Sequence, residues 1–198
     1  MATSKIRGIR PKLLLCLAVA GSLALLACSV SVKDHDKDGN SKVDIETPVG
    51  GIHVNEDVDV HDVGLAIYPG AKKKEKTGND SKSANVNISS NLFGIKVEAI
   101  EFESADSSDK VLAFYRDQLK KYGHVVECHT NSHGGDISIH AGKDASNEVS
   151  CKDGNNGKIV ELKVGTESNQ HLVSVEPQSG GCDFALVYVQ ARGKEGTI

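Results

Sequence analysis

The sequence predicts an α+β fold, in which one helix packs across one face of an antiparallel β-sheet, preceded by a small β-hairpin and a disordered tether. Three observations support this prediction. Six or so segments alternate apolar and polar residues with a period of two, most of them are joined by short turns, and one segment repeats apolar residues at helical spacing. Strands joined by short turns pair antiparallel, and a lone amphipathic helix must bury its apolar stripe against them.

The first strands are predicted in a β-hairpin segment, residues 43–63. Val43 and Ile45 alternate with polar residues before the Pro/Gly turn at residues 48–51, and Ile52 and Val54 alternate after it. A two-stranded hairpin is marginal by itself, so it should pack on the main domain or stay mobile.

The main α+β domain is predicted over residues 64–191. It contains a second hairpin, with alternating residues 86–88 and 95–99 joined by the turn at 91–94. Further strands are expected at residues 125–128, 137–139, 159–164, 171–175 and 184–189. The last of these is apolar on both faces, which indicates a central strand. Residues 192–198 are predicted to be a loose tail.

A single helix is predicted from about Ser107 to Tyr122. Asp106 is a suitable N-cap, and Gly123 is placed to end the helix. One stripe at helical spacing holds the apolar residues that should face the sheet: Val111, Leu112, Tyr115, Leu119 and Tyr122.

The N-terminus has the pattern of an export signal. Four basic residues precede an uncharged run that begins at Leu13 and ends in small residues. The exit, Leu25-Leu26-Ala27-Cys28, resembles the lipobox of bacterial lipoproteins, where signal peptidase II cuts before a diacylglycerol-modified cysteine. The resemblance implies a signal peptide at residues 1–27, acylation of Cys28 with chains such as palmitate, and a membrane as partner through this lipid. The alternative is an uncleaved transmembrane anchor over residues 13–32.

Two further features concern location. In the lipoprotein family an aspartate after the lipid cysteine often retains the protein at the inner membrane. Ser29 at that position implies the periplasmic side of the outer membrane. Residues 67–190 also resemble an uncharacterised bacterial envelope domain, in which a Tyr-Pro-Gly-Ala start, here Tyr68 to Ala71, precedes a hairpin and a helix. This second resemblance implies a fold and a location but no activity.

The charge of the mature chain argues against nucleic acid as a partner. Removing the four basic residues of the signal leaves 19 Lys and Arg against 27 Asp and Glu, a net charge of −8. Such a body repels phosphate backbones, and aromatic residues for base stacking are few. An envelope protein or a glycan remains a candidate partner.

Two groups of residues are candidate metal ligands, although no cofactor is the main expectation. Asp34, Asp36 and Asp38, followed by glycine, resemble the start of a calcium loop, but they lie in a segment, residues 28–42, whose small and charged composition predicts a flexible tether. His129 and His133 lie between two cysteines and are candidate zinc ligands, with exposed loop histidines as the alternative.

Three thiols remain in the mature chain besides Cys28. In an oxidising compartment one pair and one free thiol are expected. Cys128 ends a predicted strand and Cys151 closes the loop after it, so we predict a disulfide between them and a free Cys182. A bridge closing a loop of roughly 24 residues stabilises by about 3 kcal/mol in the chain-entropy model.

Sequence patterns of catalysis are lacking: there is no Gly-x-Ser-x-Gly, no His-Glu-x-x-His and no phosphate-binding glycine loop. We therefore expect a membrane-anchored envelope lipoprotein, not an enzyme, that acts as a binding or structural module. The alternatives are a periplasmic lipoprotein that binds a divalent metal and an envelope hydrolase whose site residues are dispersed in the sequence.

Overall fold

A computed structural model describes residues 29–33, 42–56, 58–75, 82–135, 137–142, 146–152 and 156–193. The strands are β1 (Ser29–Lys33), β2 (Lys42–Thr47), β3 (Gly50–Asn55), β4 (Lys72–Lys73), β5 (Ser83–Ser90), β6 (Phe93–Ser104), β7 (Val126–Thr130), β8 (Ile159–Thr166), β9 (Asn169–Gln178) and β10 (Gly181–Gly193). The helices are α2 (Val60–Val63), α3 (Ser108–Leu119) and the 3₁₀ turn η2 (Lys120–Tyr122). No helix in these ranges has the length and apolarity to span a bilayer.

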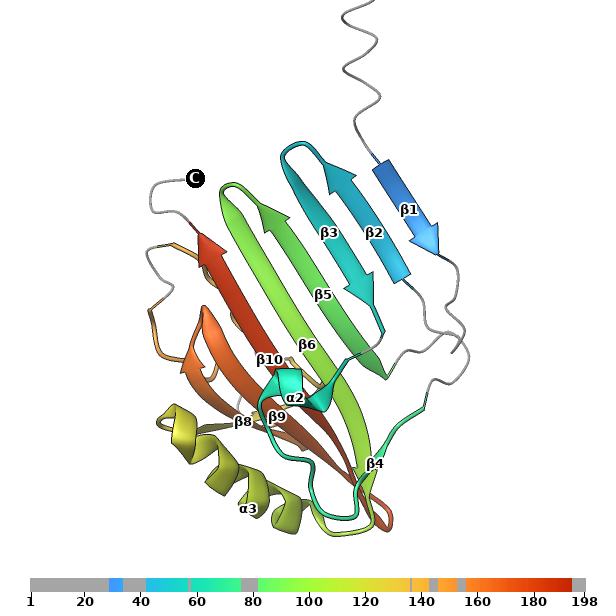
Figure 1. The fold of residues 1–198 in the computed structure, drawn as a ribbon. Coiled ribbons are helices and arrows are strands. Elements are labelled where there is room, and N and C mark those ends of the chain that lie inside the picture. Colours follow the sequence, from blue (N-terminus) through green and yellow to red (C-terminus); the bar gives the residue numbers. More distant parts are fainter. Residues whose placement is uncertain are drawn as a thin grey trace, which may run out of the picture.

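All ten described strands belong to one antiparallel sheet. Its order is β1-β2-β3-β5-β6-β10-β9-β8-β7, and the short β4 pairs with β6. Figure 1 shows the strands side by side, with α3 crossing beneath β8 and β9 and α2 lying over the middle of the sheet. The structure confirms a sheet-dominated fold with one long helix packed on it. It also confirms that the last strand is central, because β10 lies between β6 and β9.

Both predicted hairpins form, and they belong to the same sheet. Pro48-Val49 joins β2 to β3, and a similar two-residue turn joins β5 to β6. Strand β3 then pairs with β5, with Gly50 opposite Ser90. Backbone hydrogen bonds therefore connect the predicted 43–63 segment with the predicted 64–191 domain in one sheet. The segment also contains α2, a single turn that the sequence pattern does not predict, capped by the Asp59 carboxylate.

The predicted helix is observed as α3 followed by η2. Its buried stripe is Val111, Leu112, Tyr115 and Leu119. The N-cap is Ser107 rather than Asp106, whose carboxylate instead accepts hydrogen bonds from Lys110 and from the Tyr68 hydroxyl. The helical spacing places Tyr122 in the stripe, but the tighter 3₁₀ turn rotates it out, and it is 37% exposed.

The two faces of the sheet carry separate apolar clusters. The helix face packs against α3 and α2, and its cluster includes Phe102, Leu162, Val175, Phe184 and Leu186. The opposite face, here called the loop face, carries a smaller cluster of Leu172, Ala185, Val187 and Val189, against which Ile137 packs. The strand predicted at residues 137–139 is not formed. This segment covers the loop face without joining the sheet.

The first strands extend beyond the helix, as Figure 1 shows. Cross-strand pairing continues the loop face from Val97 through Val86 and Val54 to Val43, and these side chains are half-buried. The C-terminal half of the sheet is therefore covered on both faces, whereas α3 does not cover the N-terminal half.

Strands occupy parts of the segments predicted as tether and tail. The composition of residues 29–33 predicts flexibility, but they form β1, because Val30 and Val32 alternate in register with Ile45 and Val43 of β2. Asp34, Asp36 and Asp38 lie outside the described residues, as do Cys28 and residues 1–27, for which a signal peptide is predicted. At the other end, β10 continues through Arg192 to Gly193, the first two residues of the predicted loose tail.

Candidate functional site

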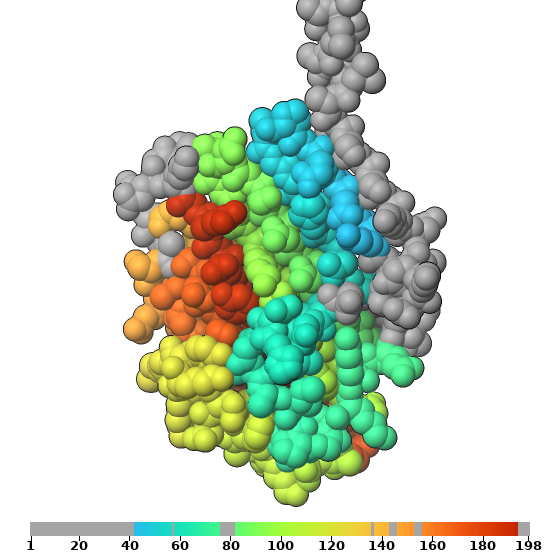
Figure 2. Space-filling view, in the orientation of Figure 1, coloured from blue at the N-terminus to red at the C-terminus, as the bar shows by residue number. Residues whose placement is uncertain are grey.

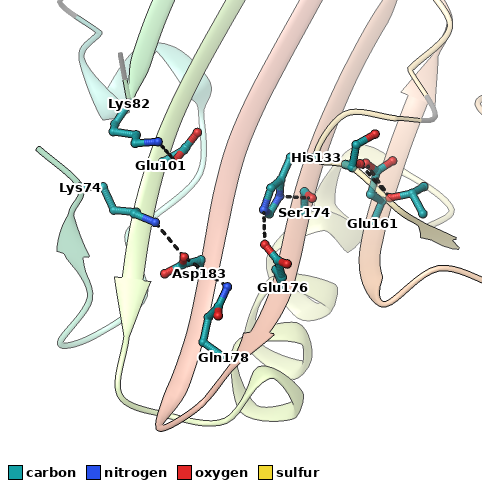
Figure 3. A network of polar contacts seen from close by, with 11 residues as sticks. Lys74, Lys82, Glu101, His133, Glu161, Ser174, Glu176, Gln178 and Asp183 are labelled. Carbon is teal, nitrogen blue, oxygen red and sulfur yellow. Dashed lines mark hydrogen bonds and ion pairs between the residues drawn. The ribbon is translucent and has the colours of Figure 1, made fainter. Parts of the chain in front are cut away.

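A row of polar side chains crosses the loop face and is the main candidate site. Strands β6 to β10 contribute to it, together with residues flanking β4, β5 and β7 (Figure 3). We call this set the polar row: Lys74, Lys82, Glu101, Thr130, His133, Glu161, Ser174, Glu176, Gln178 and Asp183. The register explains the row, because Asp183 lies opposite Glu176 and Ser174 lies opposite Glu161 on one face.

One end of the polar row is a set of ion pairs. Lys74 Nζ lies 2.7 Å from Asp183 Oδ2, and Lys82 Nζ lies 3.7 Å from Glu101 Oε2. The side chains of Lys74 and Asp183 are about one quarter exposed, at 25% and 26%. The cross-strand carboxylates Asp183 and Glu176 thus each have a cationic or polar partner, which reduces their mutual repulsion.

His133 connects the row to the loop after β7. Its Nδ1 lies 2.6 Å from the Ser174 hydroxyl, and its Nε2 lies 3.3 Å from a Glu176 carboxylate oxygen. A serine, a histidine and an acid in contact are the elements of a nucleophilic triad. However, Ser174 is 0% exposed. Its hydroxyl is covered by the imidazole that it contacts, so the observed geometry fastens the loop to β9 and offers no nucleophile to a substrate.

Glu161 is a buried carboxyl beneath the same loop. It accepts hydrogen bonds from the Gly135 amide at 3.1 Å and the Thr130 hydroxyl at 3.3 Å, while its Oε2 has no hydrogen-bond partner among the described residues. Burial raises the pKa of Glu161, and the ammonium of Lys163 opposes the rise. Raised carboxyl pKa values occur at catalytic sites, but the hydrogen bonds of Glu161 are to the end of β7 and to the loop that covers it.

The disulfide predicted between Cys128 and Cys151 is present, with Cα atoms 5.5 Å apart. Cys182 is the free thiol among the described residues and is buried. Burial, and then the carboxylates of Asp183 and Asp106, raise the pKa of the Cys182 thiol. A thiol with a raised pKa is a poor nucleophile, which argues against a reactive role for Cys182.

The structure separates the two histidines proposed as metal ligands. His129 lies on the helix side of β7, where its Nε2 is 3.6 Å from Glu127, a partner of Arg116 on α3. His133 lies on the loop face, against β9. Within the described ranges, no three His, Cys, Asp or Glu side chains are grouped as a metal site. The zinc pair His129 and His133 is therefore not assembled, and the Asp34 to Asp38 loop lies outside these ranges.

A second polar cluster lies on the helix face. The ring of His171 stacks on Tyr122, with centroids 3.8 Å apart, and the Tyr122 hydroxyl donates to the Gly64 carbonyl at 2.6 Å. Burial, with a smaller effect of the Lys121 ammonium, lowers the pKa of His171 to about 4. Nearby, Glu98 is 0% exposed and pairs with Lys96 at 2.9 Å. These contacts join α2, η2 and the sheet.

The buried charged residues Glu98, Glu161 and Lys163 are not predicted from the sequence. Polar residues that alternate with apolar ones in a strand usually face solvent. The sequence pattern does not reveal that other segments cover the faces on which these three residues lie. A usable signal was the number of apolar neighbours on both sides of Glu161 and Lys163, which is typical of a strand buried on both faces.

Comparison of the chain with models of protein families, with curated proteins and with solved structures gives no match.

Proposed function

We propose that this chain is a lipoprotein of the bacterial cell envelope, acylated on Cys28 and placed on the periplasmic side of the outer membrane. Its α+β domain acts without catalysis, as a module that binds or supports another envelope component. The observation that carries this proposal is the lipobox-like Leu25-Leu26-Ala27-Cys28 directly before β1. Because β1 begins at Ser29, the anchor is followed at once by the sheet rather than by a long tether.

The short connection changes how the domain is expected to work. A flexible tether of about 14 residues would allow a reach of roughly 20 Å. An anchor attached to β1 instead holds the sheet next to the bilayer, with the edge strand fixed in register with β2. A domain placed in this way suits contact with a component at the membrane surface. The half-buried loop-face side chains of β2, β3 and β5 offer an apolar surface for a protein or glycan partner.

Acylation is tested by intact-mass spectrometry of protein from the membrane fraction. The expected N-terminus is residue 28 with acyl chains attached, and Cys28→Ala should release the protein from the membrane. Cys182→Ala is the matched control, since it also removes a thiol but leaves the lipobox intact, and it should stay membrane-bound. A wild-type protein that begins before Leu13, or that is soluble, would contradict the proposal.

A hydrolase is the second candidate function, because His133 contacts both Ser174 and Glu176. The full burial of Ser174 argues against it. Turnover of ester or amide substrates by the purified protein, abolished in Ser174→Ala but retained in Ser168→Ala, would replace the non-catalytic proposal. Calorimetric titration with calcium, zinc and copper tests the metal-binding alternative, for which micromolar binding lost in Asp36→Ala or His133→Ala would be decisive.

A further inference from the structure

Three exposed hydrophobic side chains gather at one end of the sheet. Val49 is 71% exposed at the turn between β2 and β3, and Leu92 and Phe93 are 50% and 45% exposed at the turn between β5 and β6. The turns are neighbours, because Gly50 at the start of β3 lies opposite Ser90 at the end of β5. Figures 1 and 2 show both turns at the upper end of the molecule. We call this end the hairpin end.

The geometry of the turns does not require these residues. Two-residue hairpin turns favour glycine, asparagine and aspartate, which adopt positive φ or bond to the backbone. Among the described residues no side-chain-bearing residue has a positive φ. Val49 and Leu92 therefore serve no special backbone conformation, and both place apolar surface in water at a site where polar residues fit equally well.

The chain enters the sheet at this same end. Ser29, the first residue of β1, lies opposite Glu46, one position before the last residue of β2. Residue 28 precedes Ser29, so lipid on Cys28 would enter the bilayer from the hairpin end. The inference thus rests on the proposed acylation.

One charged residue at the hairpin end, Arg192, fits a membrane interface. Arg192 lies opposite Gly94 in the sheet, and with Leu92 and Phe93 it lines a surface depression beside the β5–β6 turn. Arginine and aromatic side chains are favoured at the level of lipid headgroups, where the cation meets phosphate and the ring meets the acyl region. Glu46 is an acid at this end, and His53 Nε2 lies 3.1 Å from its carboxylate.

We propose that the hairpin end is a membrane-contact surface. Val49, Leu92 and Phe93 insert into the interface of the bilayer that holds the lipid, and the sheet stands with its strands directed away from the membrane. The acyl chains supply the affinity, and the two hairpin tips fix the orientation of the domain. The opposite end, with the β9–β10 turn, then points into the periplasm.

The chain contains no tryptophan, so one introduced tryptophan reports its own environment. Phe93→Trp places the reporter at the hairpin end, and Leu92→Trp repeats the test if the first variant folds poorly. Ile67→Trp is the matched control, because Ile67 has a similar exposure of 44% and lies next to Tyr68, which contacts the start of α3 far from the hairpin tips. The proteins are expressed from the full sequence, isolated from membranes and reconstituted in phosphatidylethanolamine and phosphatidylglycerol vesicles. Intact-mass spectrometry shows whether each protein carries acyl chains.

In the Phe93→Trp protein, the expected result is a shift of the indole emission to shorter wavelength and strong quenching by brominated lipid. Neither effect is expected in the Ile67→Trp protein. An acylated Phe93→Trp protein that is not quenched, or equal quenching of the two variants, overturns the membrane-contact surface and leaves the anchor intact.

Two further outcomes are distinguishable. In the Phe93→Trp protein, a blue shift without bromolipid quenching indicates a second copy of the chain on the hairpin end, and this also overturns the membrane-contact surface. Quenching of the same reporter in a protein without acyl chains supports the surface but refutes the proposed anchor.

Discussion

Individual core residues determine how tightly α3 holds the sheet. Leu119 is 0% exposed in the helix-face cluster. We expect Leu119→Ala to lower the free energy of unfolding by about 2–5 kcal/mol, because it removes buried methyl groups and leaves a cavity. Urea denaturation followed by circular dichroism measures the change. Asp117→Ala is the control, since its side chain is 77% exposed on the same helix, and it should change stability by no more than about 0.5 kcal/mol.

His171 makes the stability depend on pH. Its pKa falls to about 4 in the folded protein, below the value of about 6.5 of an exposed imidazole. Between these pH values the unfolded chain binds a proton that the folded chain excludes. The free energy of unfolding therefore falls as the pH decreases from about 6.5 towards about 4, and no further contribution is lost below that.

The size of this effect is measured with His171→Phe, which keeps a ring against Tyr122 but cannot titrate. Between pH 7 and pH 4.5 the wild type should lose about 2–3 kcal/mol more stability than the variant. His61→Asn, at an exposed position of α2, should lose stability with pH as the wild type does. Equal pH dependence in wild type and His171→Phe would show that His171 is protonated in the folded state.

Single residues were predictable only where a local spacing identifies them. Apolar positions in α3 and β10 were predictable because their spacing matches the element that buries them. The polar row was not, because Ser174, Glu176 and Asp183 come together with His133 only through strand register and loop closure. His133 is a candidate metal ligand by its position in the sequence, whereas its contacts in the structure are to Ser174 and Glu176.

Among the elements, the disulfide holds the long segment after β7 on the sheet. Reduction should lower the free energy of unfolding by about 3 kcal/mol, since the loop between Cys128 and Cys151 is then free in the unfolded state. Chemical denaturation with and without reductant measures the loss. The double variant Cys128→Ala/Cys151→Ala is the control, because it should be equally stable in both conditions. A wild type that is insensitive to reductant would show that the bridge contributes little.

Elements with a strong local pattern were predictable, and those that depend on partners were not. Helix α3 and the two hairpins have clear periodicity and turn residues. Strand β1 is short and is followed by a run of charged residues. The composition of the segment therefore predicts a flexible tether, although Val30 and Val32 alternate with serine as in a strand. Helix α2 has only four residues, and its stability comes from the Asp59 cap and from packing of Val63 on the sheet.

At the scale of the whole molecule, chain order and spatial order agree in part. Neighbouring strands β2 and β3, β5 and β6, and β8, β9 and β10 pair in sequence, as expected for short turns. The pairing of β6 with β10 joins the two halves of the sheet across a long sequence separation. No local pattern encodes this pairing, nor that of β3 with β5, which joins the predicted hairpin segment to the predicted domain in one continuous sheet.

The register of β1 also determines how the protein resists mechanical force. Five consecutive residues of β1 pair with β2, from Ser29 with Glu46 to Lys33 with Lys42. A pull on the chain ahead of Ser29 acts along the strand axis, whereas the hydrogen bonds lie across it. The paired positions then share the load in shear rather than opening one after another. A domain attached to a membrane in this way would keep its sheet folded under a pulling force better than one attached through the end of an unzipping hairpin.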